Sequence, residues 1–338
     1  MSSEPARSSA AFESLRVRLA ALIEQSPRSG PMVIASVVGF VTGVGAVVFL
    51  WLIGVVEWLI LDQLFGRALA DMPGWLILFA PALGGLLVAP IVMRLAPETR
   101  GGGVPEVIMA VEVDRARIRP RVGPLKALAS ALTLGSGGSG GTEGSIVQIG
   151  STFGSTVGQW LRLSDENTRL LLASGAAAGV AAVFNAPIAG VFFALEVILR
   201  RFSTRNFSVV VLASVVGTTT AVTFRGDDPV LLVPAYGLGH PSEILLYALL
   251  GALCAGAAVL FTRVLYAVDV AARRQRTVPP LLMPAAGGLV VGVLGLWHSG
   301  ALGLGDAATD AALMGDMGVQ TMVLLFGLKM ATTVTTLA

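Results

Sequence analysis

The chain has 338 residues, of which 54% are hydrophobic and 13% are charged, and its mean hydropathy is +0.80. Its formal net charge of +2 is too small to indicate a nucleic-acid partner. A single cysteine, Cys254, excludes a disulfide framework, and His240 and His298 lie too far apart in the chain to indicate a metal site. We therefore expect an all-α, multi-pass membrane protein that needs no cofactor and no metal.

Residues 1–30 are polar and of mixed charge, and they include an amphipathic segment at 11–25. This pattern predicts a cytoplasmic N-terminal segment with a helix on the membrane surface, and it does not match a cleavable signal peptide. Uncharged stretches that approach or exceed the ~20 residues needed to cross a bilayer follow at 31–56, 75–93, 170–195, 206–224 and 279–304.

The placement of arginine predicts the orientation of these spans. Basic clusters precede the first span and follow the second, and others lie at 115–121, 200–205 and 273–276. The segments 62–74 and 225–243 are neutral or acidic. By the positive-inside rule, the N-terminus is cytoplasmic and these two segments are external. The expected location is a cell membrane, specifically a bacterial inner membrane.

A first candidate site follows the three glycines that begin at Gly101, in the sequence GGGVPE. Pro105 and Glu106 suit the first turn of a helix, and the apolar stretch 105–113 is too short to cross a membrane. The sequence therefore predicts a half-helix whose start presents the N–H groups of Gly102, Gly103 and Val104. The simpler alternative is a turn.

A second candidate site is the stretch GSGGSGGTEGSIVQIG at 135–150. Its glycines predict a helix break inside the membrane, and the lone acid Glu143 marks a new helix start with the N–H groups of Gly144, Ser145 and Ile146. Two helix starts that point together form an anion site without a basic side chain. The Glu143 carboxylate would compete with the anion for that site. The alternatives are a flexible linker at 135–141 and a purely capping role for Glu143.

Three pairs of segments resemble each other in the same order along the chain. Residues 39–49 match 251–261 at an offset of 212, and residues 81–88 and 125–134 match 284–291 and 328–337 at an offset of 203. A basic segment precedes the first copy and an external, acidic segment precedes the second. This arrangement predicts a first membrane repeat at 31–225 and the start of a second, inverted repeat at 240–338.

At the offset of 203, Ala338 corresponds to Gly135, so the sequence ends where the second glycine-rich break would begin. We expect a fragment of a longer protein, and a naturally shortened form is the alternative.

The motifs GGGVPEV, GTEGSIVQIG and GVAAVFNAPIAGVFFALE resemble the CLC family of chloride channels and proton-coupled chloride exchangers, in the family's order and spacing. The resemblance covers about residue 30 to the end. It implies an inverted-repeat fold of tilted and broken helices, a homodimer with one pore in each subunit, and chloride or a similar monovalent anion as the ligand. It also implies that Glu143 is the external gate and that the backbone of Gly144, Ser145 and Ile146 binds the anion.

Three positions depart from the family's pattern. Gly102 stands where chloride-selective members carry a serine that binds the ion, and Ser145 replaces the usual proline. Val197 stands where exchangers carry an internal glutamate that transfers protons, and a valine cannot relay a proton. The neighbouring Glu196 lies about 100° around the helix and is a poorer substitute.

The leading prediction is therefore transport of chloride through a pore gated by Glu143, as a voltage- or proton-gated channel. A proton-coupled anion antiporter is the first alternative. A membrane fragment that transports nothing is the second, because the second-repeat half of the site is absent from this sequence. No constellation of nucleophile, base or paired carboxylates indicates an enzyme.

Overall fold

The computed structural model describes residues 29–63, 74–227, 231, 233–234, 237 and 239–338. Most of the predicted N-terminal segment, including its amphipathic stretch at 11–25, lies outside the described residues. Throughout the described part of the chain the regular structure is helical and no strand occurs, which confirms the predicted all-α class.

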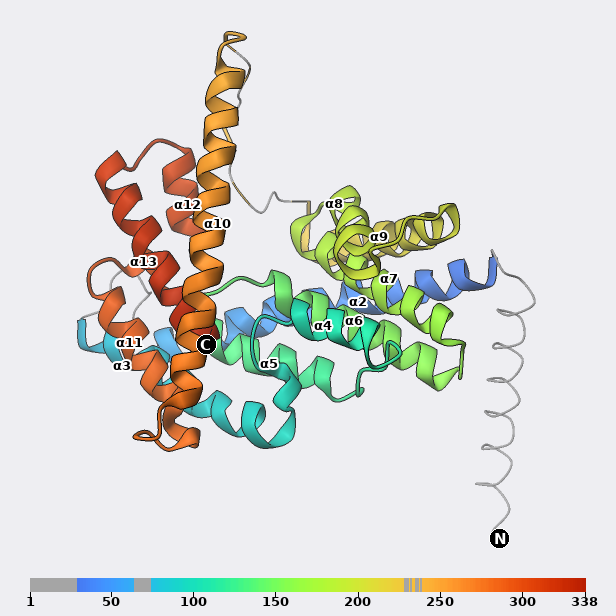
Figure 1. Cartoon of the computed structure of the whole chain (residues 1–338), viewed down its shortest axis with the longest axis horizontal. Helices are drawn as coiled ribbons and strands as arrows, with labels where there is room; N and C mark the ends of the chain where they lie inside the picture. The colour runs from blue at the N-terminus through green and yellow to red at the C-terminus, as the bar shows by residue number, and fades with distance from the viewer. Residues whose placement is uncertain (1–28, 64–73, 228–230, 232, 235–236, 238) are drawn as a thin grey trace. The chain divides into compact units, whose positions relative to one another are not determined.

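The main helices are α2 (Ser29–Glu57), α3 (Gly74–Pro90), α4 (Val104–Glu112), α5 (Val122–Gly135), α6 (Glu143–Trp160), α7 (Asp165–Phe184), α8 (Pro187–Phe193), α9 (Thr204–Arg225), α10 (Glu243–Arg274), α11 (Met283–Gly295), α12 (Asp306–Leu313) and α13 (Val319–Leu337) (Figure 1). Short π or 3-10 segments extend or join them: η1 (Trp58–Gln63), η3 (Ile91–Leu95), η4 (Pro97–Thr99), η5 (Ala194–Leu199), η6 (Pro280–Leu282) and η7 (Ser299–Ala301).

Among the described residues, five helices are long and apolar enough to cross a membrane: Ser29–Ile60, Gly74–Leu95, Asp165–Phe184, Thr204–Arg225 and Glu243–Arg274. Four of them match predicted stretches, although 170–195 divides into α7 and α8 at Asn185, whose φ of +51° ends α7. The fifth, α10, is missing from the predicted spans.

The prediction of a single span at 279–304 is wrong, because this stretch forms η6, the 13-residue α11 and η7. The chain turns after Gly295, where a Cβ would lie 2.8 Å from the Leu302 side chain. The return of the chain at Leu302 therefore packs on the end of α11, and a longer straight helix is not formed.

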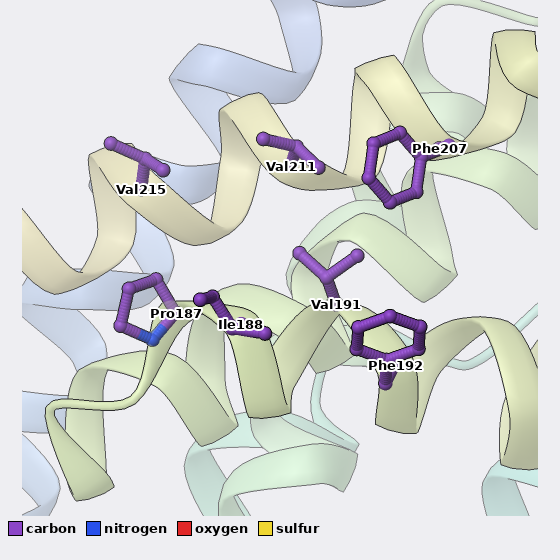
Figure 2. Close-up of a pocket in the computed structure, with 7 residues that line it drawn as sticks. All are labelled: Pro187, Ile188, Val191, Phe192, Phe207, Val211 and Val215. Carbon is purple, nitrogen blue, oxygen red and sulfur yellow. The ribbon is translucent and has the colours of Figure 1, made fainter.

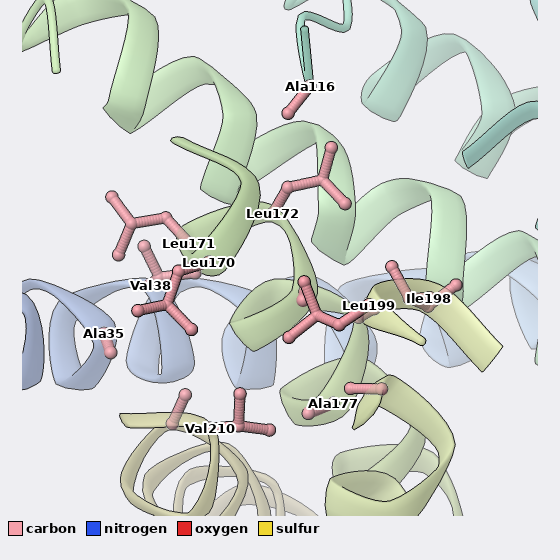
Figure 3. Packing of buried hydrophobic residues seen from close by; sticks show 14 of the residues in the cluster. Ala35, Val38, Ala116, Leu170, Leu171, Leu172, Ala177, Ile198, Leu199 and Val210 are labelled. Carbon is pink, nitrogen blue, oxygen red and sulfur yellow. The ribbon is translucent and has the colours of Figure 1, made fainter. Parts of the chain in front are cut away.

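The described residues group into two compact units. The first unit takes in the described parts of Met1–Leu52, Gly102–Leu128 and Thr142–Pro229. Helix α7 runs through its core, and 83% of the residues in the apolar stretch of this helix are buried. Leu172 of this helix lies in one buried apolar cluster with Val38 of α2 and Ile198 of η5, as Figure 3 shows. Helices α6 and α7 approach so closely that a Cβ at Gly150 would overlap the carbonyl oxygen of Gly175. A Cβ at Gly175 would likewise overlap the carbonyl oxygen of Gly150. Small residues therefore permit direct backbone contact, as in other membrane helix pairs.

The second unit takes in the described parts of Ile53–Gly101, Ala129–Gly141 and Val230–Ala338, and the packing of α3 on α11 dominates it. A Cβ at Gly85 would overlap the carbonyl oxygen of Pro284, and a Cβ at Gly288 would overlap that of Pro81. Both pairs of equivalent residues are separated by 203 positions, the offset of the sequence repeat. Reciprocal contacts of this kind are what a two-fold relation produces, so they support the predicted repeat. Each predicted repeat contributes one helix to this contact, so the second compact unit contains helices of both repeats, and the predicted repeat boundaries stay a prediction.

The two repeats also contain similar half-helices. The nine-residue α4 follows Gly103, whose φ is +93°, and the eight-residue α12 follows Gly305, whose φ is +86°. Only glycine adopts such angles without strain, so both helices begin abruptly at a glycine. The sequence predicted α4 but not α12.

Candidate anion site at the starts of α4 and α6

The start of α4 combines a left-handed glycine with a proline in the first turn. The first intrahelical hydrogen bond runs from the Val107 N–H to the Gly103 carbonyl over 3.2 Å, so the Val104 amide precedes it. The Gly103 N–H donates to Oε2 of Glu106 over 2.9 Å. Of the three predicted donors at this helix start, the Gly103 amide is thus already engaged by a carboxylate of its own helix.

The start of α6 follows Thr142, which makes no side-chain cap. The Ile146 N–H donates to the Thr142 carbonyl over 2.9 Å, so this amide belongs to the helix ladder and not to the predicted set of outward donors. The amides of Glu143 and Gly144 precede that bond. Because helix starts carry a positive partial charge, this end of α6 favours a bound anion or the Glu143 carboxylate.

The fold brings the two helix starts into backbone contact within the first unit. A Cβ at Gly144 would overlap the carbonyl oxygen of Gly102, and a Cβ at Gly103 would overlap the carbonyl oxygen of Gly144. A Cβ at Gly102 would meet no atom within 4 Å. The predicted donors at 102–104 and at 144 therefore share one neighbourhood, with open space beside Gly102.

Gln148 also lies at this contact, and it was not among the predicted site residues. It is 1% exposed, and its Oε1 lies 3.3 Å from the Cβ position of Gly103. Residues four apart share one face of a helix. The sequence feature that could have identified Gln148 is its position four residues after Gly144, as a polar residue in a largely apolar stretch.

Ser145 is buried at 6% exposure, whereas the Glu143 side chain is exposed. Val197 lies on η5, is half-buried and packs against the apolar cluster of the first unit, and the neighbouring Glu196 is exposed. The side chain at 197 thus packs in an apolar setting.

We also searched the described residues for a metal site and for other pockets. Within the described ranges, no group of three or more His, Cys, Asp or Glu side chains could hold a metal ion. An apolar groove of about 220 Å³ lies between α8 and α9 (Figure 2), lined by Pro187, Ile188, Val191, Phe192, Phe207, Val211 and Val215.

The glycine-rich loop at 135–141, called the glycine loop below, is packed and not a free linker. Its residues from Gly135 to Gly140 are buried. Ser139 accounts for two of its contacts to α13: its N–H donates to the Thr336 hydroxyl over 3.1 Å, and its hydroxyl lies 2.9 Å from that of Thr333. The alternative of a flexible linker is therefore wrong.

Comparison with known proteins identifies relatives over most of the chain. The family model described as "Voltage gated chloride channel" matches residues 84–338. The chloride channel protein CLC-e of Arabidopsis thaliana is 31% identical over 298 residues, which cover 82% of this chain and 41% of that protein. The H(+)/Cl(-) exchange transporter ClcA of Cronobacter sakazakii is 33% identical over 313 residues, which cover 90% of this chain and 66% of that protein.

Solved structures give the same result for the fold. The structure of a slow cyanobacterial Cl−/H+ antiporter matches with a TM-score of 0.78 and 26% identity, covering 90% of this chain and 73% of that one. A CLC-type fluoride/proton antiporter matches with a TM-score of 0.76 and 23% identity, covering 91% and 76%. The chain thus spans only part of the length of each relative. The helical fold, the repeat contacts and these matches together show that the chain belongs to the voltage-gated chloride channel (CLC) family.

Proposed function

We propose that this chain forms part of a pathway that carries chloride or a similar monovalent anion across a membrane. The observation behind the proposal is the backbone contact between the starts of α4 and α6, at Gly102, Gly103 and Gly144. The amides of Val104 and Gly144 precede the first intrahelical bonds there. Partial charges at helix starts attract an anion, and they hold it weakly enough to allow release.

Glu143 is the proposed gate of this pathway. It occupies the first position of α6, where the helix dipole stabilises a carboxylate, and its side chain is exposed. When the carboxylate is ionised, it competes with the free anion for the donors of the helix start. Protonation removes this competition and admits the anion.

For the mode of transport, we propose proton-coupled exchange as the better supported of two candidates. ClcA of Cronobacter sakazakii, which is 33% identical to this chain, is described as an H(+)/Cl(-) exchange transporter. An uncoupled channel is the second candidate, and it rests on Val197, which replaces the family's proton-transfer glutamate and cannot hold a proton.

Reconstitution of the purified protein in liposomes tests these proposals. An imposed chloride gradient is expected to drive chloride flux and, in an exchanger, uphill proton movement in the opposite direction. Chloride flux without proton movement would reject the exchanger in favour of the channel. No chloride flux, beside an active full-length relative as the positive control, would reject transport and favour the non-transporting fragment.

We also propose a homodimer in a bacterial inner membrane with a cytoplasmic N-terminus. Support for the dimer comes from the apolar α8–α9 surface, on which Ile188 is 72% exposed and Phe192 is 45% exposed. Cysteine crosslinking at position 188 in membranes is expected to give a covalent dimer. A monomer at all protein-to-lipid ratios would contradict it.

A further inference from the structure

Lys329 on α13 contacts a segment that lies 26 residues earlier in the chain. Its ammonium group donates to the carbonyl oxygen of Gly303 over 2.7 Å. It also approaches Gly305, where a Cβ would lie only 3.0 Å from Nζ. A short hydrogen bond from a charged donor is about twice as strong as a neutral one, so this contact fixes Gly303 firmly on α13.

Gly303 in turn holds the glycine loop. Its N–H donates to the Gly137 carbonyl over 3.2 Å, and its carbonyl accepts from the Gly140 N–H over 3.3 Å. The Gly303 carbonyl therefore receives both the Lys329 ammonium and the Gly140 amide. Gly303 has a φ of +57°, a conformation that favours glycine and that sets the direction of this carbonyl.

A second set of contacts fixes the same loop to the same helix without any charge. Ser139, which is fully buried, bonds to the hydroxyls of Thr333 and Thr336 on α13. The loop is thus held at both Ser139 and Gly140. Gly141 ends the loop, and Glu143 follows two residues later in the chain.

We infer that Lys329 is a positioning residue for Glu143: through the Gly303 carbonyl it fixes the glycine loop, and the fixed loop restrains Glu143 through the short covalent link between Gly141 and Glu143. This inference rests on the proposed gating role of Glu143. It gives a role to one of the two lysines of the chain, whose repeat counterpart is Lys126 at the offset of 203.

The charge of Lys329 offers a competing explanation, because Lys329 also attracts the Asp306 carboxylate electrostatically. Thr336→Val distinguishes fixation of the loop from an effect of charge, because it removes a loop contact and leaves every charge in place. Thr335→Val is the matched control on α13, since the Thr335 hydroxyl bonds only within its helix, to the Ala331 carbonyl over 2.8 Å. Lys329→Arg keeps a charged donor at the position where Lys329→Met removes it.

The first measurement is amide hydrogen exchange of a peptide that covers 135–141 in the intact protein. Loss of a charge-assisted bond is expected to speed exchange about tenfold in Lys329→Met. Thr336→Val should act in the same direction, Lys329→Arg should stay close to wild type, and Thr335→Val should leave exchange unchanged. Unchanged exchange in both Lys329→Met and Thr336→Val would overturn the inference.

The second measurement is anion flux into liposomes at neutral pH, in the wild-type and Glu143→Gln backgrounds. Both Lys329→Met and Thr336→Val are expected to raise wild-type flux about threefold or more, and neither should change the flux of Glu143→Gln, because coupled residues are not additive. Equal effects in both backgrounds, or an effect of Lys329→Met alone, would overturn the link to Glu143. If the wild type carries no anion, the proposed function fails and the link fails with it, while the exchange rates still decide whether Lys329 fixes the loop.

Discussion

The backbone of Gly144, at the start of α6, packs directly against the carbonyl oxygen of Gly102, which precedes α4. No side chain fits between them, because a Cβ at Gly144 would occupy the position of that oxygen. The same contact holds Gly103 against the Gly144 carbonyl. Two positively polarised helix starts are therefore held together by direct contact between their backbones.

Gly144→Ala is expected to destabilise the protein, because the new methyl group meets backbone that cannot move aside easily. Overpacking of this kind costs about 1–3 kcal/mol. Thermal unfolding in detergent measures the effect. Gly102→Ala is the matched control, because a Cβ there meets no atom within 4 Å, and it should unfold like the wild type. Equal unfolding temperatures for both variants would contradict the close contact.

Gly102→Ser is expected to raise the preference for chloride over nitrate. The open space beside Gly102 accepts the side chain, and the hydroxyl adds a hydrogen-bond donor beside the proposed site. A gain of about 1 kcal/mol for chloride, or roughly fivefold in relative flux, is the expected size. Competitive flux measurements in liposomes determine it. Gly102→Ala separates the hydroxyl from the added bulk, and an equal change in both variants would count against hydroxyl binding.

Glu143→Gln is expected to abolish the rise of anion flux on acidification and to give high flux at neutral pH. The amide mimics the protonated carboxyl, so the competition with the anion is absent at every pH. Anion flux into liposomes, measured as a function of pH, tests this. Glu112→Gln removes another exposed acid in the first unit and should keep the wild-type profile. If Glu143→Gln retains the wild-type pH dependence, the gating role fails.

Val197→Glu is expected to increase the number of protons moved per anion if position 197 lies on the proton route. The new carboxyl can carry a proton, whereas the amide of the similarly shaped Val197→Gln cannot. Both variants place a polar group against the apolar cluster of the first unit. Both variants should therefore lose similar stability, about 1–3 kcal/mol. Proton and chloride fluxes recorded together give the ratio. An unchanged ratio in Val197→Glu would show that protons bypass this position.

Gly288→Ala is expected to destabilise the packing of α3 on α11, since its Cβ would overlap the Pro81 carbonyl. Gly85→Ala should lower the free energy of unfolding by a similar amount, because its Cβ would overlap the Pro284 carbonyl at the equivalent contact. The expected loss is about 1–3 kcal/mol for each. Gly287→Ala is the control, because its Cβ would lie at an ordinary 3.6 Å from the Thr335 carbonyl oxygen. Denaturant unfolding compares the three, and a marked difference between Gly85→Ala and Gly288→Ala would argue against a symmetric repeat.

Several features of the fold follow from local sequence and were predictable. Long apolar stretches predicted four of the membrane-crossing helices, because the cost of burying charge depends on each residue's own chemistry. Pro105 after three glycines predicted the abrupt start of α4. Glu143 was correctly placed at a helix start, since the glycines before it oppose a continuous helix.

Other features depend on partners that lie far away in the chain. The Gly103 amide is engaged by Glu106, and the Ile146 amide belongs to its own helix, so fewer amides face outward than the sequence suggested. The stretch 279–304 bends because Leu302 returns onto Gly295, a contact that hydropathy does not report.

The sequence by itself determined the helical membrane class, the repeat and the two glycine-marked helix starts, because these depend on composition and on spacing along the chain. Only the tertiary structure decided that Gly102 and Gly144 touch, and that Lys329 reaches the Gly303 carbonyl that holds the glycine loop. The physical reason is that each contact includes a backbone carbonyl, and the position of a backbone group is set by the packing of whole helices and not by the identity of its own residue.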